Sequence, residues 1–138
     1  MGEHQNQIGR EYEKILAKYL NKKFGFWVYQ IPPKTNGQPC DIIALKKKVS
    51  FLMDAKHVEE SKVSFTFDRI EPNQITALAY AHNFAQIENV GFAIYFERDK
   101  TWYWLPYDTF LYLHNLKEKS VNKGLLVKLE DVINENLN

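Results

Sequence analysis

The stretch that decides the fold is residues 39–58, which read PCDIIALKKKVSFLMDAKHV. An apolar strand over residues 41–45, a turn at 46–48 and a return strand over 49–58 predict a β-hairpin. A tight hairpin brings its two ends together, so Asp41 and Asp54 lie at the same end of the sheet. Lys56 follows Asp54 by two residues and projects from the same face of the strand. The hairpin therefore places two carboxylates and an ammonium together beside a buried strand.

The flanking sequence predicts an α/β domain, with a mixed β-sheet flanked by helices in the order α-β-β-β-α-β-β-α. The prolines and the Asn-Gly pair of residues 31–39 predict a loop. Residues 59–69 predict an irregular connection, and the next helix is apolar on most sides, which predicts burial on both faces. The other predicted elements are a helix over 5–23, a strand over 26–31, a helix over 72–88, a hairpin of strands 91–98 and 101–105, and helices over 108–119 and 129–137.

Length and composition indicate one folded domain over residues 1–138, since 45% of the residues are hydrophobic and 14% are aromatic. A single cysteine excludes a disulfide scaffold and a cysteine zinc cluster, and it suits a reducing cytoplasm. No apolar run approaches the roughly 20 residues that cross a bilayer, so no membrane partner is expected.

The net charge of +1 hides an asymmetry that favours a polyanionic partner. Residues 1–56 carry ten Lys and Arg against five acids, a net of +5, whereas residues 57–138 carry eight against twelve, a net of −4. A basic surface of this kind is typical of nucleic-acid binding, although a solvated surface is the simpler alternative.

The clustered carboxylates predict a metal site. Two neighbouring carboxylates repel each other unless a cation lies between them. Oxygen ligands without Cys or His suit Mg²⁺, with Mn²⁺ as a substitute. A lysine beside such a cation can orient or deprotonate an attacking water and can neutralise charge on a phosphate. The pattern predicts a phosphodiester hydrolase, and its alternative is a cross-strand ion pair at a strand end.

The first helix supplies a third acid. Helical spacing places Glu13 at the border of the apolar stripe, where it reaches the sheet end, and places Glu11 at the surface. Gly9 lacks a side chain where helix and strand can approach closely.

These residues resemble the PD-(D/E)XK nuclease superfamily, which has the restriction-endonuclease-like fold. The matching motifs are Gly9-x-x-x-Glu13, Gly25-Phe26, Pro39-x-Asp41 and Asp54-x-Lys56. Later segments resemble the RecU-type Holliday junction resolvases, and the likeness spans roughly residues 8–125. These segments are Asn73-Gln74, residues 91–96, residues 102–106 and residues 117–121.

The resemblance implies a homodimeric, Mg²⁺-dependent endonuclease that nicks four-way DNA junctions symmetrically. It implies that Glu13, Asp41 and Asp54 form the acidic metal site and that the carbonyl of Ala55 adds a ligand. Lys56 becomes the catalytic lysine, and Gln74 matches a helix glutamine of the family, with capping of the helix backbone as its alternative role.

Several features depart from the RecU pattern. Cys40 separates Pro39 from Asp41, and Asp54 stands where Glu is commoner. The loop from Pro32 to Cys40 is far shorter than the stalk with which RecU proteins engage the junction centre, and little sequence precedes the first helix. The chain is closer in size to the archaeal resolvases or to a minimal phage version.

Several lysines are candidate phosphate contacts, which position DNA without specifying its sequence. They are Lys22, Lys23, Lys34, Lys46, Lys47 and Lys48. The alternative interpretation is that these lysines lie in solvated turns and contact only water. Cys40 is predicted to be a buried filler, and His57 to point away from Lys56. The functional alternatives are another nuclease of the superfamily, of restriction or repair type, and a non-catalytic DNA-binding relative. A structural or interaction domain remains the simplest competing hypothesis.

Overall fold

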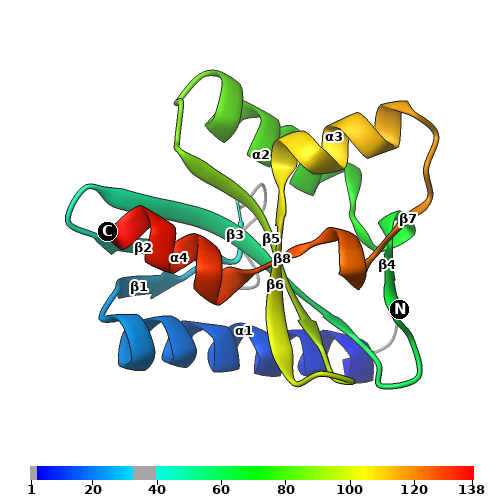
Figure 1. Cartoon of the computed structure of the whole chain (residues 1–138), viewed down its shortest axis with the longest axis horizontal. Helices are drawn as coiled ribbons and strands as arrows, with labels where there is room; N and C mark the ends of the chain where they lie inside the picture. The colour runs from blue at the N-terminus through cyan, green and yellow to red at the C-terminus, as the bar shows by residue number, and fades with distance from the viewer. Residues whose placement is uncertain (1–2, 33–39) are drawn as a thin grey trace.

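The computed structural model describes residues 3–32 and 40–138 and shows helices on both faces of a central β-sheet (Figure 1). The predicted α/β class is confirmed. The helices are α1 (Glu3–Phe24), α2 (Pro72–Asn83), α3 (Tyr107–Asn115) and α4 (Leu129–Leu137). The strands are β1 (Trp27–Gln30), β2 (Ile42–Lys46), β3 (Val49–Val58), β4 (Ser64–Thr66), β5 (Asn89–Phe96), β6 (Thr101–Pro106), β7 (Ser120–Asn122) and β8 (Val127–Lys128).

The central sheet is mixed, as predicted. Within the described residues its strand order is β1-β2-β3-β5-β6-β8, and every neighbouring pair is antiparallel except β3 and β5. The parallel pair needs a crossover, and α2 lies within it. In Figure 1, α1 runs along the bottom of the sheet and α2 and α3 lie at the top.

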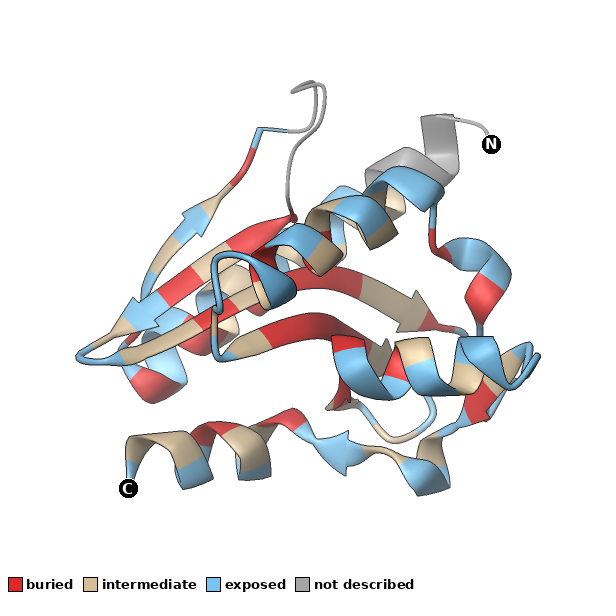
Figure 2. Ribbon diagram, turned by 90° about the horizontal axis from the view of Figure 1, so that it is seen from above, coloured by how far each residue is buried: buried red, intermediate tan, exposed pale blue. Residues whose placement is uncertain are grey.

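Two hydrophobic cores lie on opposite faces of this sheet. One contains Leu16 and Leu20 of α1 and Ile133 of α4, and the other contains Leu78 of α2 and Phe110 of α3. Figure 2 shows the buried residues concentrated along the central strands. Alternating side chains of β3 enter the two cores in turn: Met53 and Ala55 face α1, whereas Leu52 and Val58 face α2. Asp54 and Lys56 therefore belong to the α2 face.

Three short strands depart from the predicted order. β4 and β7 form a small second sheet, so the segment predicted as irregular, 59–69, contains a strand and a 3-10 helix, Phe67–Arg69. β8 adds an edge to the main sheet through Val127. Strands of two or three residues are too short to show an alternating pattern, and tertiary pairing alone defines them.

The helix α2 ends five residues before its predicted end and has one exposed side. It begins at Pro72, and Glu71 and Gln74 form a capping box. Tyr80 and Phe84 are exposed at 64% and 74%, so the prediction of a helix buried on both faces is wrong for this chain. None of the described helices combines the length and hydropathy that a bilayer crossing requires.

Candidate active site

The candidate site forms where β2 and β3 separate. Their pairing ends at Ile42 and Met53, after which β3 continues for five residues. The backbone N–H of Asp41 donates to the Met53 carbonyl at 3.2 Å, and the N–H of Ala55 donates to Asp41 Oδ2 at 2.9 Å. The carboxylate of Asp41 thus takes the place of the missing strand and is fixed beside β3.

Asp54 is the most deeply buried acid of the site, at 1% exposure. Its Oδ2 atom is buried and has no hydrogen-bond partner in the described structure. Burial, followed by repulsion from Asp41 and from Glu13, holds the pKa of Asp54 well above its usual value, although Lys56 opposes the shift. A buried carboxylate oxygen without a donor is costly, and a bound cation would relieve this cost.

Glu13 reaches the same place from α1. It shares hydrogen bonds with Asp41 and with Gln30 of β1. Burial, then the charge of Asp41 and the hydrogen bond to it, raises the pKa of Glu13 to about 8. The structure therefore brings the three predicted acids together, as the helix border position predicts.

Lys56 is held by oxygen atoms on the opposite side of β3 from Glu13. Its Nζ donates to Gln74 Oε1 at 3.1 Å and to the backbone carbonyl of Arg69 at 3.1 Å. Gln74 Oε1 also accepts the N–H of Glu71 at 3.0 Å. Gln74 thus performs the predicted helix capping and, through the same oxygen, positions the lysine beside the carboxylates.

The oxygen donors of the site fit a divalent cation whose coordination is completed by other ligands. In the described part of the chain, no group of three or more His, Cys, Asp and Glu side chains is placed so that it could hold a metal ion. Mg²⁺ is commonly bound through one or two carboxylates plus water and phosphate oxygens. The Ala55 carbonyl faces the same open edge as its N–H, since both groups of a strand residue point to one side. The ligand set Glu13, Asp41, Asp54 and Ala55 stays a prediction.

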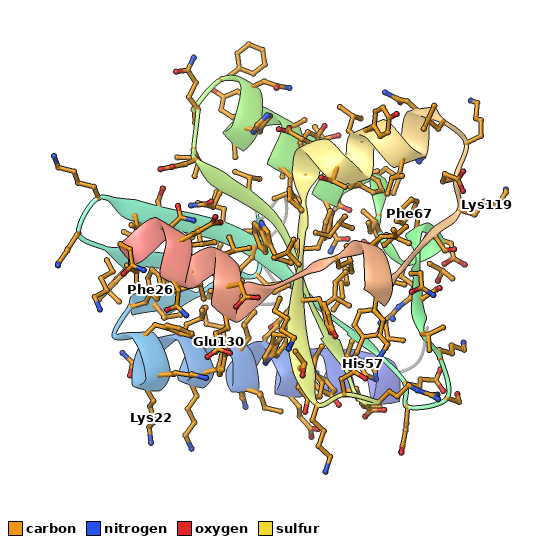
Figure 3. All side chains as sticks on the ribbon, in the orientation of Figure 1. Lys22, Phe26, His57, Phe67, Lys119 and Glu130 are labelled. Atoms are coloured by element: carbon orange, nitrogen blue, oxygen red, sulfur yellow. The ribbon has the colours of Figure 1, made fainter. Side chains whose placement is uncertain are left out.

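The candidate DNA-binding lysines lie away from the carboxylates. Lys47 and Lys48 are exposed at the far tip of the β2–β3 hairpin, about 20 Å along the strand from Asp41. Lys46 donates to the carbonyl of Phe24 at 2.7 Å. Figure 3 shows Lys22 and His57 toward opposite ends of α1.

The other lysines differ in their surroundings. Lys23 forms an ion pair with Glu130 at 2.7 Å, whereas Lys22 is exposed. Lys34 lies outside the described residues. A role of any of these lysines in DNA binding stays a prediction.

The neighbouring residues behave largely as the sequence predicts. Cys40 is buried, and burial raises the pKa of its thiol to about 12, which makes it a poor nucleophile. His57 stacks on Tyr12 of α1 with ring centroids 4.5 Å apart, on the side of β3 away from Lys56. Glu11 is exposed.

The sequence analysis missed two residues that shape the site. Arg69 donates from Nη1 to the carbonyl of His57 and so satisfies the free edge of β3. No local pattern indicates this contact, because it depends on how the 59–69 segment folds back. Gln30 could have been found by alternation, since Val28 faces α1 and the residue two positions later shares its face.

The fold of the chain is similar to that of a solved structure. The structure of Hjc, a Holliday junction resolvase from the archaeal hyperthermophile Archaeoglobus fulgidus, matches with a TM-score of 0.68. The match covers 91% of this chain and 99% of that chain at 17% sequence identity. The chain has the fold of this resolvase. No family model matches the sequence, and no curated protein matches it.

Proposed function

We propose that the chain is a metal-dependent, structure-specific DNA endonuclease that resolves four-way junctions by hydrolysing phosphodiester bonds. The observation that carries this proposal is the convergence of Glu13, Asp41, Asp54 and Lys56 at the point where β2 and β3 separate. The shared fold of the archaeal resolvase supports the choice of substrate.

Each residue has a role in this proposal. Asp41 and Asp54 would hold Mg²⁺ or Mn²⁺, with Glu13 and the Ala55 carbonyl completing the protein ligands. A divalent cation at this position supplies a Lewis acid and lowers the pKa of water. Lys56 presents a fixed ammonium that neutralises negative charge on the scissile phosphate, and Gln74 keeps it in place.

Symmetric cutting of a junction needs two sites, so we propose a homodimer. Tyr80 and Phe84 support it because they form a stacked aromatic pair on the exposed side of α2, with centroids 5.3 Å apart. We expect Phe84→Ser to shift the protein from dimer to monomer in light scattering. A mass that is unchanged in this variant would remove α2 as the interface.

Two alternatives are weaker. A non-catalytic DNA-binding relative has no need for a buried carboxylate such as that of Asp54, whose Oδ2 atom has no hydrogen-bond partner in the described structure, at a place where phosphates would bind. A nuclease of restriction or repair type shares the same chemistry and differs in the DNA that it cuts.

The test is cleavage of labelled four-way junctions, linear duplexes and flaps, each with and without Mg²⁺. We expect Mg²⁺-dependent cutting of the junction, its loss in Asp41→Asn and Asp54→Asn, and unchanged junction binding. The matched control is Asp68→Asn, which changes an exposed aspartate. Equal cutting of all three substrates would reject the resolvase but keep the nuclease, whereas full activity of both site variants would remove the site.

A further inference from the structure

Within the described residues, a partly exposed surface of the central sheet adjoins the candidate site. On β1 and its neighbours β2 and β3, one set of alternating side chains faces the α2 side of the sheet, but α2 and α3 pack over β5 and β6 instead. We call this surface the aromatic face. Its members are Trp27, Tyr29, Ile43, Leu45, Ser50 and Leu52.

Two aromatic rings dominate this face. Trp27 is 60% exposed and Tyr29 is 47% exposed, and both lie on β1, the edge strand that pairs with β2. Their planes are within 9° of parallel, with centroids 6.3 Å apart. A flat ring that stacks against one of them is therefore parallel to both.

The position of the aromatic face links two proposed DNA contacts. Tyr29 is in register with Ile43 and Leu52, two residues before Asp54, which is about 7 Å along the strand. In the other direction, the row of Trp27 and Leu45 is followed by the exposed Lys47 and Lys48 at the hairpin tip. All six side chains of the face are uncharged, so nothing on it repels a phosphate backbone that runs from the lysines to the carboxylates.

We propose that Trp27 and Tyr29 form a stacking platform for a nucleobase of the DNA held at the cleavage site, an inference that rests on the proposed function. Aromatic rings interleaved with lysines are the surface that binds unstacked bases, because every base has a flat face. In a continuous duplex both faces of each base pair are covered by neighbours. The platform is therefore occupied where stacking is interrupted, as at the exchange point of a junction or in an unpaired strand.

The charges around the aromatic face favour DNA, rather than a second copy of the chain, as the molecule that binds there. The lysines at one end of the face and the proposed phosphate site at the other give it the charge pattern of a polyanion path. A dimer through this face would bury that path and separate the platform from its substrate.

Trp27 allows a direct test because the other two tryptophans are buried, Trp102 at 5% and Trp104 at 4% exposure. The experiment uses Asp54→Asn protein, so that no DNA is cut, with a four-way junction and a covalently closed circular duplex as probes. We expect the junction to quench the exposed tryptophan emission and the duplex to quench it much less.

The substitutions separate stacking from other contacts. Trp27→Leu keeps apolar area without a ring, and we expect it to weaken junction binding at least about fivefold while changing duplex binding less than about twofold. Trp27→Phe should retain most of the affinity. Tyr112→Leu, which changes an exposed aromatic of α3, is the matched control and should bind as the parent protein does.

The outcomes distinguish the two proposals. Junction binding that is equal in Trp27→Leu and its parent overturns the platform and leaves the nuclease proposal intact. A lower mass of Trp27→Leu in light scattering, with junction binding equal to that of the parent, assigns the face to a second copy and also overturns the platform. Absence of junction binding by every variant, including the control, removes both proposals.

Discussion

Asp54→Asn is expected to make the protein more stable while it removes the response to Mg²⁺. The carboxyl of Asp54 is buried with one oxygen unmatched, and leaving a buried polar atom without a partner costs about 1–3 kcal/mol. An amide carries no charge, and its N–H₂ can donate to the neighbouring carboxylate of Asp41. We expect a gain of about 1–2 kcal/mol at pH 8, which raises Tm by about 3–8 °C for a chain of this size.

The pH dependence of this gain has a definite sign. The pKa of Asp54 is raised by burial in the folded protein, so the folded chain keeps a proton that the unfolded chain releases above about pH 4. The folded state therefore binds more protons, and stability falls as pH rises. Asp54→Asn removes this contribution, and its advantage over the parent should be larger at pH 8 than at pH 5.

The assay is thermal unfolding followed by circular dichroism at both pH values, with and without Mg²⁺. A cation at ten times its Kd stabilises the folded parent by about 1.4 kcal/mol, or roughly 4 °C, and we expect no such shift in the variant. Asp68→Asn should retain the parent's Tm within about 2 °C and its Mg²⁺ shift. A variant that is less stable than the parent at pH 8 and still responds to Mg²⁺ would refute the reasoning.

Three further predictions concern the site and its support. Gly91→Ala should lower the free energy of unfolding by about 1–3 kcal/mol in urea titration, because a Cβ there would lie 2.3 Å from the carbonyl oxygen of Leu105; an unchanged midpoint would contradict that close approach. Gln74→Ala should lower the free energy of unfolding by about 1 kcal/mol, because the helix cap is lost. It should also slow single-turnover junction cleavage, because Lys56 loses the hydrogen bond to Gln74 Oε1. Cleavage at the parent rate would leave capping as the role of Gln74. Mg²⁺ affinity should increase with pH up to about 8, since burial and Asp41 raise the pKa of Glu13 to about 8 in the metal-free site and the cation must displace that proton; Glu13→Gln should lose this pH dependence in Mg²⁺ titration, and a dependence that it leaves intact would exclude Glu13 as the titrating group.

The elements that sequence predicted well are those with long, regular patterns. β3 runs over Val49–Val58 and α4 over Leu129–Leu137, both at the predicted boundaries, and the mixed sheet follows from them. The end of α2 was placed too late because Phe84 continues the apolar pattern. That side chain lies at the surface, and periodicity does not say which apolar residues a single chain leaves exposed.

The site was predictable as far as it depends on register and helix phase. Hairpin pairing brought Asp41 to Asp54, and helical spacing brought Glu13 to the sheet end. The contact of Lys56 with the Arg69 carbonyl depends on a crossover whose path no local pattern describes. Resemblance singled out Gln74, but only the structure shows that one oxygen caps α2 and also holds the lysine.

The separation of β2 from β3 creates the candidate site at a cost in stability. A paired strand would satisfy the N–H of Ala55 and the carbonyl of His57 with backbone groups. Here a carboxylate of Asp41 and a guanidinium of Arg69 do so instead, and the Ala55 carbonyl stays at an open edge. The pKa of Asp54 is raised first by burial and then by repulsion from Asp41, the same residue that accepts the N–H of Ala55 at this edge. Binding of the proposed cation would recover this cost, so the gap that weakens the metal-free fold would also contribute to the affinity for the metal.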